Sequence, residues 1–304
     1  MARYLVTGGA GFIGTNLIKE LVALGHHVRS FDNYIGGRFS ERHIASVEYE
    51  EGDVRDLEAL RQAMIDIDGV FHLAAVPRVP YSVEQPLLTN EHNVTGTLNV
   101  LVAARDAKVR RVVFSTSSSI YGGNRGDVAI TEDMKPDPQS PYALQKLAGQ
   151  EYCRLFSSLY GLETVALCYF NVYGPYMDPK GAYALVVGKF LEQRRNGEPL
   201  TICGDGEYYR DYTHVKDIAH ANVLAMTATS VGKGECINIG NCHPISVNQL
   251  ATLIGGPSVF VPPRLGDVRF TKADNTKAKT LLGWEPTIMI EEGLSEMKKL
   301  WNIT

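Results

Sequence analysis

The stretch Thr7-Gly8-Gly9-Ala10-Gly11-Phe12-Ile13-Gly14 decides the expected fold. It follows an apolar run, Tyr4–Thr7, and opens an amphipathic stretch, Phe12–Leu24, whose apolar residues recur with helical spacing. Glycines in a GxxGxxG pattern permit a tight turn and let backbone N–H groups approach a pyrophosphate at the positive end of the helix dipole. The strand before and the helix after supply the context that this motif requires for dinucleotide binding. The residues expected at the cofactor here are Gly8, Gly11, Phe12, Ile13 and Gly14.

Outward from this stretch, short apolar runs alternate with amphipathic helical patterns. Such alternation predicts βαβ units and a parallel sheet with helices on both faces. The expected class is therefore α/β, with a Rossmann-type, doubly wound parallel sheet. Strands are expected at Tyr4–Thr7, His27–Phe31, Val47–Tyr49, Val70–Leu73, Arg111–Ser115 and Thr164–Tyr169, and helices at Phe12–Leu24, Leu57–Met64, Leu88–Ala107 and Tyr142–Tyr160.

The pattern loosens in the second half of the chain, where glycine and proline recur often. This change near Asn171 predicts a dinucleotide-binding domain over residues 1–170 and a smaller α/β lobe for the substrate over residues 171–304. The boundary is soft, because the chain is free to cross between the lobes more than once.

The composition of the 304 residues limits the classes of function. With 44% hydrophobic and 21% charged residues the chain is not a disordered protein, and a net charge of −4 argues against a general binder of nucleic acids or membrane surfaces. No apolar run is long enough for a transmembrane helix, and the strand-like run at Tyr4 leaves no room for a signal peptide. The five cysteines lack CxxC spacing, so free thiols in a reducing cytoplasm are expected rather than disulfides or a metal site.

Acidic and small residues follow the next strands, at the edge of the sheet where cofactors bind. Asp32 ends the second expected strand, where a carboxylate accepts hydrogen bonds from the adenosine ribose and repels a 2′-phosphate, which favours NAD over NADP. The alternative is a turn or capping aspartate. Asp53 follows the third strand and is expected near the adenine. The segment Leu73-Ala74-Ala75 lets the backbone lie against the cofactor, whereas His72 is interpreted as a buried structural histidine.

Tyr142 and Lys146 have the YxxxK spacing, which puts them on one face of an expected helix. The pKa of an unperturbed tyrosine is about 10. A neighbouring ammonium group and a positively charged nicotinamide ring would stabilise the phenolate and lower this pKa towards neutrality. Tyr142 could then take a proton from a substrate hydroxyl while the adjacent C–H gives a hydride to NAD, and Lys146 would also hold the nicotinamide ribose. The motif becomes specific only behind a nucleotide-binding segment, as here.

Five hydroxyl residues, Ser115-Thr116-Ser117-Ser118-Ser119, come directly after the fifth expected strand. The carboxyl ends of parallel strands are where ligands bind in such sheets. A hydroxyl there could share the substrate proton with Tyr142, and Ser117 is the first candidate with Ser118 the second. For any single one of these residues, the alternative role is to cap the strand end and bond the turn backbone.

Together these motifs resemble the extended short-chain dehydrogenases/reductases, and within them the nucleotide-sugar 4-epimerases of the UDP-glucose/UDP-N-acetylglucosamine type. The resemblance covers nearly the whole chain, with its motifs in family order. It implies that Ser117 and Tyr142 are the catalytic hydroxyl pair, assisted by Lys146, and that NAD is tightly bound and recycled. The further cofactor contacts that it implies are Asn33, Val54 and Tyr169. It rests on Gly8–Gly14, Asp32-Asn33, Gly52-Asp53-Val54, His72–Ala75, Asn93–Thr97, Ser115–Gly122, Ser140–Lys146, Tyr169–Pro175, Gly204–Asp217 and Arg264–Asp274.

The resemblance also separates possible reactions. Family dehydratases carry a Thr-Asp-Glu triplet where this chain has Ser117-Ser118-Ser119, and decarboxylases usually keep the glutamate. Without a carboxylate beside the serine, elimination of water across C5 and C6 lacks its general acid and base. Oxidation at C4, rotation of a transient 4-keto sugar and reduction from the other face need only Ser117, Tyr142 and NAD. The resemblance therefore implies an isomerase that epimerises a UDP-hexose at C4.

The resemblance further implies which residues hold the UDP group. Arg210 and Arg264 would contact the diphosphate, for which guanidinium groups are suited, although Arg210 could instead pair with one of two nearby aspartates. Asn171 would also touch the diphosphate, and Asp267 would hold the nucleotide ribose. The uracil pocket would be formed by Leu185, Val186, Lys189, Phe190, Thr201 and Ile202.

Four positions bear on the sugar. Uronic acid epimerases resemble this chain, but they tend to carry threonine at the position of Asn171 and arginine at that of Tyr176, which counts against a uronic acid. Thr271 stands where a bulky tyrosine in some relatives excludes a 2-N-acetyl group, so both N-acetylated and plain hexoses are expected to fit. Arg78 departs from the usual family residues, and it either contacts a phosphate or alters the sugar preference.

Other classes agree less well with these residues. A non-catalytic dinucleotide-binding regulator typically loses the Tyr/Lys pair, which is intact here. A 4,6-dehydratase, a uronic acid epimerase or a reductase on the same scaffold is the alternative, and a reductase would consume external cofactor. The expected partners are a UDP-sugar and a second copy of the chain, because family members often dimerise through a four-helix bundle, here Leu88–Ala107 and Tyr142–Tyr160. No nucleic acid, membrane or metal partner is expected.

Overall fold

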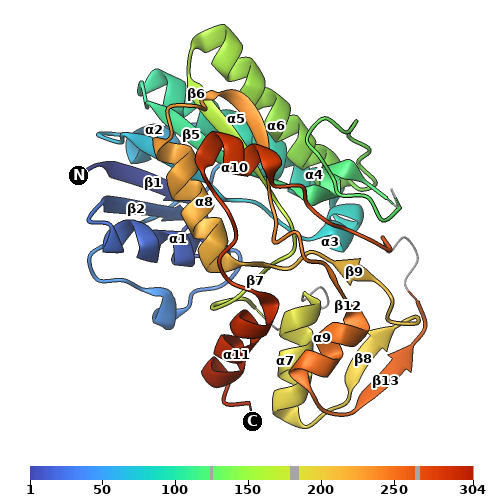
Figure 1. The fold of residues 1–304 in the computed structure, drawn as a ribbon. Coiled ribbons are helices and arrows are strands. Elements are labelled where there is room, and N and C mark those ends of the chain that lie inside the picture. Colours follow the sequence, from blue (N-terminus) through green and yellow to red (C-terminus); the bar gives the residue numbers. More distant parts are fainter. Residues whose placement is uncertain (124–125, 179–184, 264–267, 304) are drawn as a thin grey trace.

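A computed structural model of the chain describes residues 1–123, 126–178, 185–263 and 268–303, which form two lobes (Figure 1). The larger lobe contains a seven-stranded sheet with the order β11-β6-β5-β4-β1-β2-β3, and all neighbouring strands in it are parallel. Without β11, this is the 3-2-1-4-5-6 order of a Rossmann sheet. The strands are β1 Arg3–Thr7, β2 His27–Asp32, β3 Glu48–Glu51, β4 Gly69–His72, β5 Arg111–Ser117, β6 Glu163–Tyr169 and β11 Lys233–Ile239.

Helices cover both faces of this sheet because successive strand residues point to opposite faces and both sets are apolar. In β1, Tyr4 and Val6 pack into one buried cluster, whereas Leu5 packs into the other. The first cluster contains side chains of α1 Phe12–Ala23, α8 Val215–Thr227 and α10 Thr276–Leu282. The second contains side chains of α2 Leu57–Ala63, α5 Gly96–Asp106 and α6 Pro141–Tyr160.

The predicted α/β class and the Rossmann-type sheet are confirmed, and the six expected strands all occur in it. The seventh strand, β11, lies beyond residue 171 and was not predicted, because its sequence Lys-Gly-Glu-Cys-Ile-Asn-Ile has a buried apolar character only at its end. The helix α8 also follows residue 171 and packs against α1. The chain therefore returns to the sheet lobe, and a single cut at residue 171 does not separate the two lobes.

The single helix expected over Leu88–Ala107 is divided into three pieces. The helix α4, Pro86–Asn90, passes through a π-helical turn, Glu91–Thr95, into α5. Such turns insert one residue into a helix and often occur at functional sites. Here the turn carries Asn93, whose side chain bonds both the N–H and the C=O of Val76 in the segment after β4. A short helix that was not expected, α3 Val79–Glu84, occupies the same segment.

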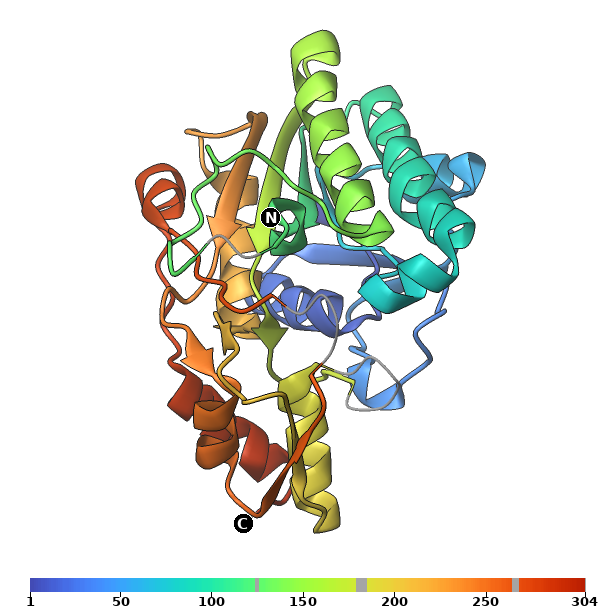
Figure 2. The same cartoon turned by 90° about the vertical axis from the view of Figure 1, so that its right-hand side faces the viewer.

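The smaller lobe lies beside the carboxyl ends of the sheet strands (Figure 2). Its three helices surround a separate apolar cluster that includes Phe190, Leu250 and Leu294. Short strand pairs join its segments: β8 with β13 in parallel, β9 with β12 antiparallel, and β7 with β10 in parallel. The elements are α7 Val186–Asn196, α9 Val247–Ile254, α11 Ile290–Leu300, β7 Val172–Tyr173, β8 Leu200–Cys203, β9 Tyr209–Arg210, β10 Thr213–His214, β12 Ile245–Ser246 and β13 Ser258–Val261.

The described segments also bear on the membrane and cysteine expectations. None of the helices in them has the length and apolar character needed to cross a bilayer. The five cysteines are unpaired, and the same segments bring together no group of three or more side chains suited to a metal ion.

Candidate active site

The glycine turn between β1 and α1 leaves no room for side chains. Gly8 has φ +73°, and a Cβ there would lie 2.7 Å from the backbone nitrogen of Ala74 at the end of β4. A Cβ on Gly14 would overlap the carbonyl oxygen of Gly8 and lie 2.7 Å from Cα of Gly9. Within the described segments no side chain caps α1, so the N–H groups of its first turn are available to a ligand. A compact anion fits this turn, as the dinucleotide pyrophosphate requires.

Asp32 is held at the end of β2 beside this turn. Its carboxylate accepts the N–H of Ala10 at 3.0 Å and the N–H of Tyr34 at 2.7 Å. Burial raises the pKa of Asp32, and these two hydrogen bonds act in the opposite direction. The structure thus gives Asp32 the turn role that was the alternative, and its remaining lone pairs are free to accept ribose hydroxyls. Both roles are compatible with the geometry.

The end of β3 contributes a second carboxylate close to the first. Asn33 donates to Asp53 at 2.9 Å, and the guanidinium of Arg55 donates to both carboxylate oxygens of Asp53. Burial opposes ionisation, but these hydrogen bonds hold the pKa of Asp53 well below its usual range. Val54 is buried and a Cβ on Gly96 would contact it. The predicted cofactor residues Asn33, Asp53 and Val54 therefore lie together, although their contacts with the cofactor stay a prediction.

The segment after β4 lies against the glycine turn. Leu73 donates its N–H to the carbonyl of Thr7 at 3.1 Å, and the backbone of Ala74 faces Gly8. His72 is fully buried and bonds the hydroxyls of Thr7 and Thr97 at 2.7 and 3.0 Å. Burial lowers the pKa of His72 to about 3, so it is neutral. The interpretation of His72 as a structural histidine is confirmed.

Ser117, Tyr142 and Lys146 meet where β5 ends and α6 begins. The hydroxyl of Ser117 interacts with that of Tyr142, and the ammonium of Lys146 lies 6.0 Å from the Tyr142 ring centroid. Lys146 donates to the carbonyl of Ser115 at 2.8 Å. Both Tyr142 and Lys146 are buried, at 9% and 4% exposure. The three predicted catalytic side chains are thus brought together by the fold.

The predicted lowering of the Tyr142 pKa includes the charge of a bound nicotinamide ring, and in the protein alone this pKa is raised. Burial raises the pKa of Tyr142 to about 12, although the hydrogen bond with Ser117 opposes this rise. Burial also lowers the pKa of Lys146 to about 7. Desolvation penalises the charged form of each group. The lowering of the Tyr142 pKa by bound cofactor stays a prediction.

The position of Tyr142 depends on residues that the sequence reasoning missed. Ser140 caps α6 by accepting the N–H of Ala143, and the buried Ser82 of α3 accepts the N–H of Tyr142 at 3.0 Å. One turn along α6, Gln145 accepts a hydrogen bond from Asn93 at 2.8 Å. The motif Asn93–Thr97 was noticed in the sequence, but its partners lie too far along the chain to be read from spacing.

The other residues at the strand ends have mixed roles. Ser119 donates both its N–H and its hydroxyl to the hydroxyl of Ser117, at 3.3 and 3.0 Å, so Ser117 also has the capping role that was the alternative. Ser118 is half-buried at the start of the next turn. Tyr169 ends β6 beside Ser117, but its hydroxyl is paired with Asn222 of α8. The hydroxyl of Tyr169 is thus engaged by the protein, and its contact with the cofactor stays a prediction.

In the smaller lobe, residues far apart in sequence converge near β9. Asn171 donates to the hydroxyl of Thr271 at 3.4 Å and to the carbonyl of Asp211 at 3.3 Å. The carboxylate of Asp211 is fully buried and accepts backbone N–H groups from residues 241, 242 and 273. Asp217 likewise accepts N–H groups of residues 287 and 288. Both aspartates are thus engaged by backbone, which weakens the alternative that one of them pairs with Arg210.

The residues predicted for the uracil pocket lie at the start of α7 and on β8. Leu185 is the exposed N-cap residue of α7, Val186 and Lys189 lie in its first turn, and Thr201 is half-buried. Ile202 is 2% exposed within the apolar cluster of this lobe, so its side chain does not line an open site. Residues on β8 alternate between the two faces, which explains the difference from Thr201. The predictions for Arg264 and Asp267 fall outside the described residues.

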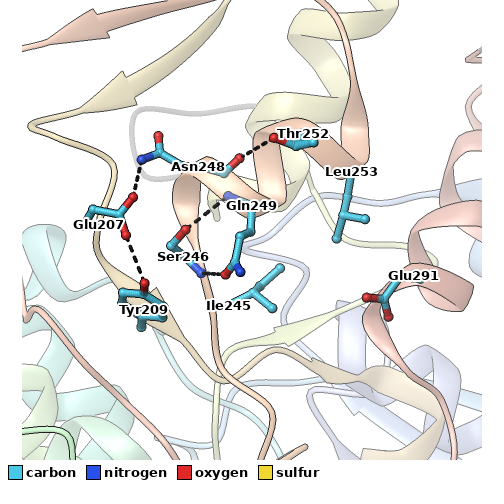
Figure 3. A pocket seen from close by; sticks show the side chains of 9 residues that line it. All are labelled: Glu207, Tyr209, Ile245, Ser246, Asn248, Gln249, Thr252, Leu253 and Glu291. Carbon is cyan, nitrogen blue, oxygen red and sulfur yellow. Dashed lines mark hydrogen bonds between the residues drawn. The ribbon is translucent and has the colours of Figure 1, made fainter.

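A cavity of about 440 Å³ opens elsewhere on the smaller lobe (Figure 3). Glu207 spans part of it by accepting hydrogen bonds from the Tyr209 hydroxyl and the Asn248 amide. None of its lining residues is among the predicted site residues. Ser117, Tyr142 and Lys146 do not line the cavity, so it is separate from these side chains.

A Rossmann sheet with a glycine turn after β1, an acidic residue after β2 and a Ser/Tyr/Lys group at β5 and α6 defines an extended short-chain dehydrogenase/reductase. The family model described as the NAD dependent epimerase/dehydratase family matches residues 4–240. The chain belongs to this family, and its cofactor is NAD.

Similar proteins include enzymes with different activities on UDP-sugars. The chain is 38% identical over 305 residues to a UDP-glucose 4-epimerase of Mycolicibacterium smegmatis, covering 97% of this chain and 96% of the relative. It is 36% identical over 313 residues to a UDP-glucuronate 4-epimerase of Thermodesulfobacterium geofontis, covering 97% and 94%. A crystal structure of UDP-glucose 4-epimerase from Thermotoga maritima with UDP-glucose superposes with a TM-score of 0.94 at 38% identity, covering 99% and 98%. The chain is thus a nucleotide-sugar enzyme of this family.

Proposed function

We propose that this protein epimerises a UDP-hexose at C4. The single observation that carries the proposal is the group of Ser117, Tyr142 and Lys146 at the end of β5, with serines rather than carboxylates at positions 118 and 119. A pair of hydroxyl groups can remove one proton from a sugar oxygen and later return it. Elimination of water would need a carboxylate beside Ser117, and the sequence has none there.

The residues have distinct roles in this reaction. NAD, when bound, accepts the hydride from C4 and returns it. Tyr142 takes the proton of the 4-hydroxyl, and Ser117 bonds the same oxygen, so that a 4-keto sugar forms. The sugar then rotates, and Tyr142 gives the proton back to the oxygen after the hydride returns to the opposite face of C4. No net oxidation occurs, because the proton and the hydride return to the sugar and the cofactor returns to its oxidised form.

Lys146 supports Tyr142 from within the buried part of α6. Its bond to the carbonyl of Ser115 fixes its position. Burial lowers the pKa of Lys146 to about 7. Together with the positive charge of the nicotinamide ring, its protonated form favours the phenolate of Tyr142. The nicotinamide ribose would be held by the same lysine.

For the nucleotide we propose UDP, held by the smaller lobe. Arg210 of β9 and Asn171, which bonds Thr271, are proposed to contact the diphosphate, because a guanidinium and an amide group can donate to phosphate oxygens. The start of α7 and Thr201 of β8 are proposed to contact the uracil. Arg264 and Asp267, which the resemblance assigns to the diphosphate and the ribose, belong to the same proposal.

For the sugar we propose that both N-acetylated and plain hexoses are accepted, because the position near Asn171 carries the small residue Thr271. Thr271→Tyr is expected to lower kcat/KM for UDP-N-acetylglucosamine by about tenfold, since overpacking costs about 1–3 kcal/mol. The loss with UDP-glucose is expected to be much smaller. Steady-state kinetics with both sugars measure this difference.

The control for this substitution is Thr271→Val, which keeps the volume and removes the hydroxyl. It is expected to leave the ratio of the two kcat/KM values unchanged. Equal losses with both sugars in Thr271→Tyr would remove the role of residue 271 in sugar selection.

The proposed activity is tested by a proton NMR time course without added cofactor. The purified protein is mixed with UDP-N-acetylglucosamine, and separately with UDP-galactose, and the anomeric signals are followed. A new signal of the C4 epimer supports the proposal, and the two rates give the sugar preference. No change with either sugar, even after NAD is added, overturns it, and UDP-glucuronate and other nucleotide sugars are then the next substrates to measure.

We also propose that the protein is a homodimer. Leu144, Leu155 and Leu159 are exposed apolar side chains on α6, at 57%, 36% and 67% exposure, and Leu87 of α4 is exposed at 82%. Exposed apolar side chains gathered on neighbouring helices are typical of an interface. The double substitution Leu155→Glu, Leu159→Glu is expected to convert a dimer into a monomer, and light scattering after gel filtration measures the mass. A wild-type protein of monomer mass would contradict the proposal.

For the cellular location we propose the reducing cytoplasm that the sequence predicts, which the free thiols fit.

A further inference from the structure

A turn of the smaller lobe, residues Gly174–Asp178, leaves the end of β7 and lies against the sheet lobe, and we refer to it as the clasp. It is closed by a hydrogen bond from the N–H of Met177 to the carbonyl of Gly174 at 3.2 Å. Tyr176 has φ +69°, a left-handed conformation that is strained in a non-glycine residue. Such a conformation persists where surrounding contacts hold it.

Those contacts come from three separate segments of the sheet lobe. Asn16 of α1 donates to the carbonyl of Pro175 at 2.9 Å, and Arg42, from the segment between β2 and β3, donates to the carbonyl of Tyr176 at 2.8 Å. The ammonium of Lys19 bonds the Tyr176 hydroxyl and lies 4.4 Å from its ring centroid. At the far end, Arg78 and Asp178 form an ion pair at 3.7 Å.

Arg42 also contacts the glycine turn. One arm of its guanidinium donates to the carbonyl of Ala10 at 2.9 Å, while the other holds the carbonyl of Tyr176. The ring of Phe39 lies under the guanidinium at 3.9 Å. Since the N–H of Ala10 is held by Asp32, both polar groups of this residue in the glycine turn are fixed. Arg42 thus joins the glycine turn directly to the smaller lobe.

The two arginines that bind the clasp come from segments on either side of β1. Arg42 follows β2 and Arg78 follows β4, and these are the two strands that neighbour β1 in the sheet. The clasp is therefore bonded to the segments that follow both strand neighbours of β1, and through Arg42 to Ala10 of the glycine turn. Movement of the glycine turn away from the clasp would have to break the bonds of Arg42.

We propose that Arg42 is a positioning residue for cofactor retention, which locks the clasp to the glycine turn and slows the release of NAD. The inference rests on the placement of the pyrophosphate at Gly8–Gly14. It deepens the proposed function, because an epimerase must keep its reduced cofactor while the 4-keto sugar rotates. Hydrogen bonds made by charged groups contribute about 1.5–3 kcal/mol each, so loss of these bonds corresponds to about tenfold faster release or more.

The test measures NAD itself and requires no sugar. Wild type, Arg42→Gln and Arg42→Lys are freed of unbound nucleotide by gel filtration, and NAD per protomer is determined after denaturation. The release of bound NAD is then followed over time by dialysis. Arg42→Gln is expected to release NAD at least about tenfold faster and to purify with substoichiometric NAD. Arg42→Lys is expected to behave in the same way, because an ammonium group keeps the charge but lacks the planar fork that reaches both carbonyls.

Three further variants separate this role from a general effect on the fold. Tyr176→Phe removes the hydroxyl contact with Lys19 but keeps the carbonyl that Arg42 binds, and Arg61→Gln removes an exposed arginine on α2. Both are expected to retain NAD as the wild type does. Asn16→Ala loses the neighbouring bond to Pro175, is expected to release NAD faster, and serves if Arg42→Gln does not fold.

Wild-type NAD content and release rate in folded Arg42→Gln would overturn the proposal, as would equally fast release in Arg61→Gln. Folding is checked by circular dichroism and by the melting temperature at saturating NAD. Failure of the proposed epimerisation would appear as no reaction with any hexose in a protein that still holds NAD. The two failures are therefore distinguishable.

Discussion

Tyr142→Phe is expected to lower kcat for UDP-galactose by about 10³-fold, within the 10²–10⁴-fold range typical of a lost general acid–base group. The substitution removes only the hydroxyl that exchanges the substrate proton. The ring of Tyr142 is buried at 9% exposure, and phenylalanine fills the same space. NAD is expected to stay bound, because the glycine turn is distant in sequence and independent of this hydroxyl. Turnover is measured by a coupled assay, and NAD content after gel filtration.

Ser117→Ala provides the comparison for this prediction. It is expected to reduce kcat less than Tyr142→Phe, because positioning by the remaining groups persists. It also removes the acceptor that Ser119 bonds and the hydrogen bond that opposes the raised pKa of Tyr142. Near-normal turnover in Tyr142→Phe would contradict the assignment of Tyr142 as the proton-transfer group.

Gly14→Ala is expected to reduce NAD affinity by about 100-fold or more, and to yield protein nearly free of NAD. The added Cβ would overlap the carbonyl oxygen of Gly8 and lie 2.7 Å from the Cα of Gly9, and both are backbone atoms that cannot rotate away. The glycine turn must then shift, and overpacking of this kind costs about 1–3 kcal/mol, at the upper end where the backbone has to move. Isothermal titration with NAD measures the change.

The matched control is Gly123→Ala, where an added Cβ has no heavy atom within 4 Å among the described residues. This variant is expected to bind NAD as the wild type does. Wild-type NAD affinity in Gly14→Ala would show that the glycine turn does not hold the pyrophosphate. It would also remove the premise on which the role of Arg42 depends.

Most of the cofactor lobe was predictable because its patterns are local. A strand, a glycine turn and a helix occupy consecutive residues, so Gly8–Gly14 can be read directly with its neighbours. Tyr142 and Lys146 are one helical turn apart, and the helix that carries them was predicted to begin and end close to its observed limits, Pro141–Tyr160. Even there, the raised pKa of Tyr142 in the protein alone was not predicted, because burial of both groups is a property of the packed core.

The substrate lobe was less predictable because its contacts join distant parts of the chain. Asn171 and Thr271 meet although a hundred positions separate them, and β11 enters the sheet from beyond the expected boundary. No local pattern in the sequence indicates a role for Arg42, since its partners Ala10 and Tyr176 lie 32 and 134 positions away.

The sequence by itself determined the α/β class and the glycine turn and predicted the hydroxyl group of Ser117 and Tyr142, because helical and strand periodicity and short motif spacings are encoded within a few turns of chain. The tertiary structure alone decided which strand completes the sheet, how Ser82 and Asn93 support α6, and how the clasp meets the glycine turn. These features depend on long-range strand pairing and side-chain packing, whose partners are selected by the burial of the whole core and not by local spacing.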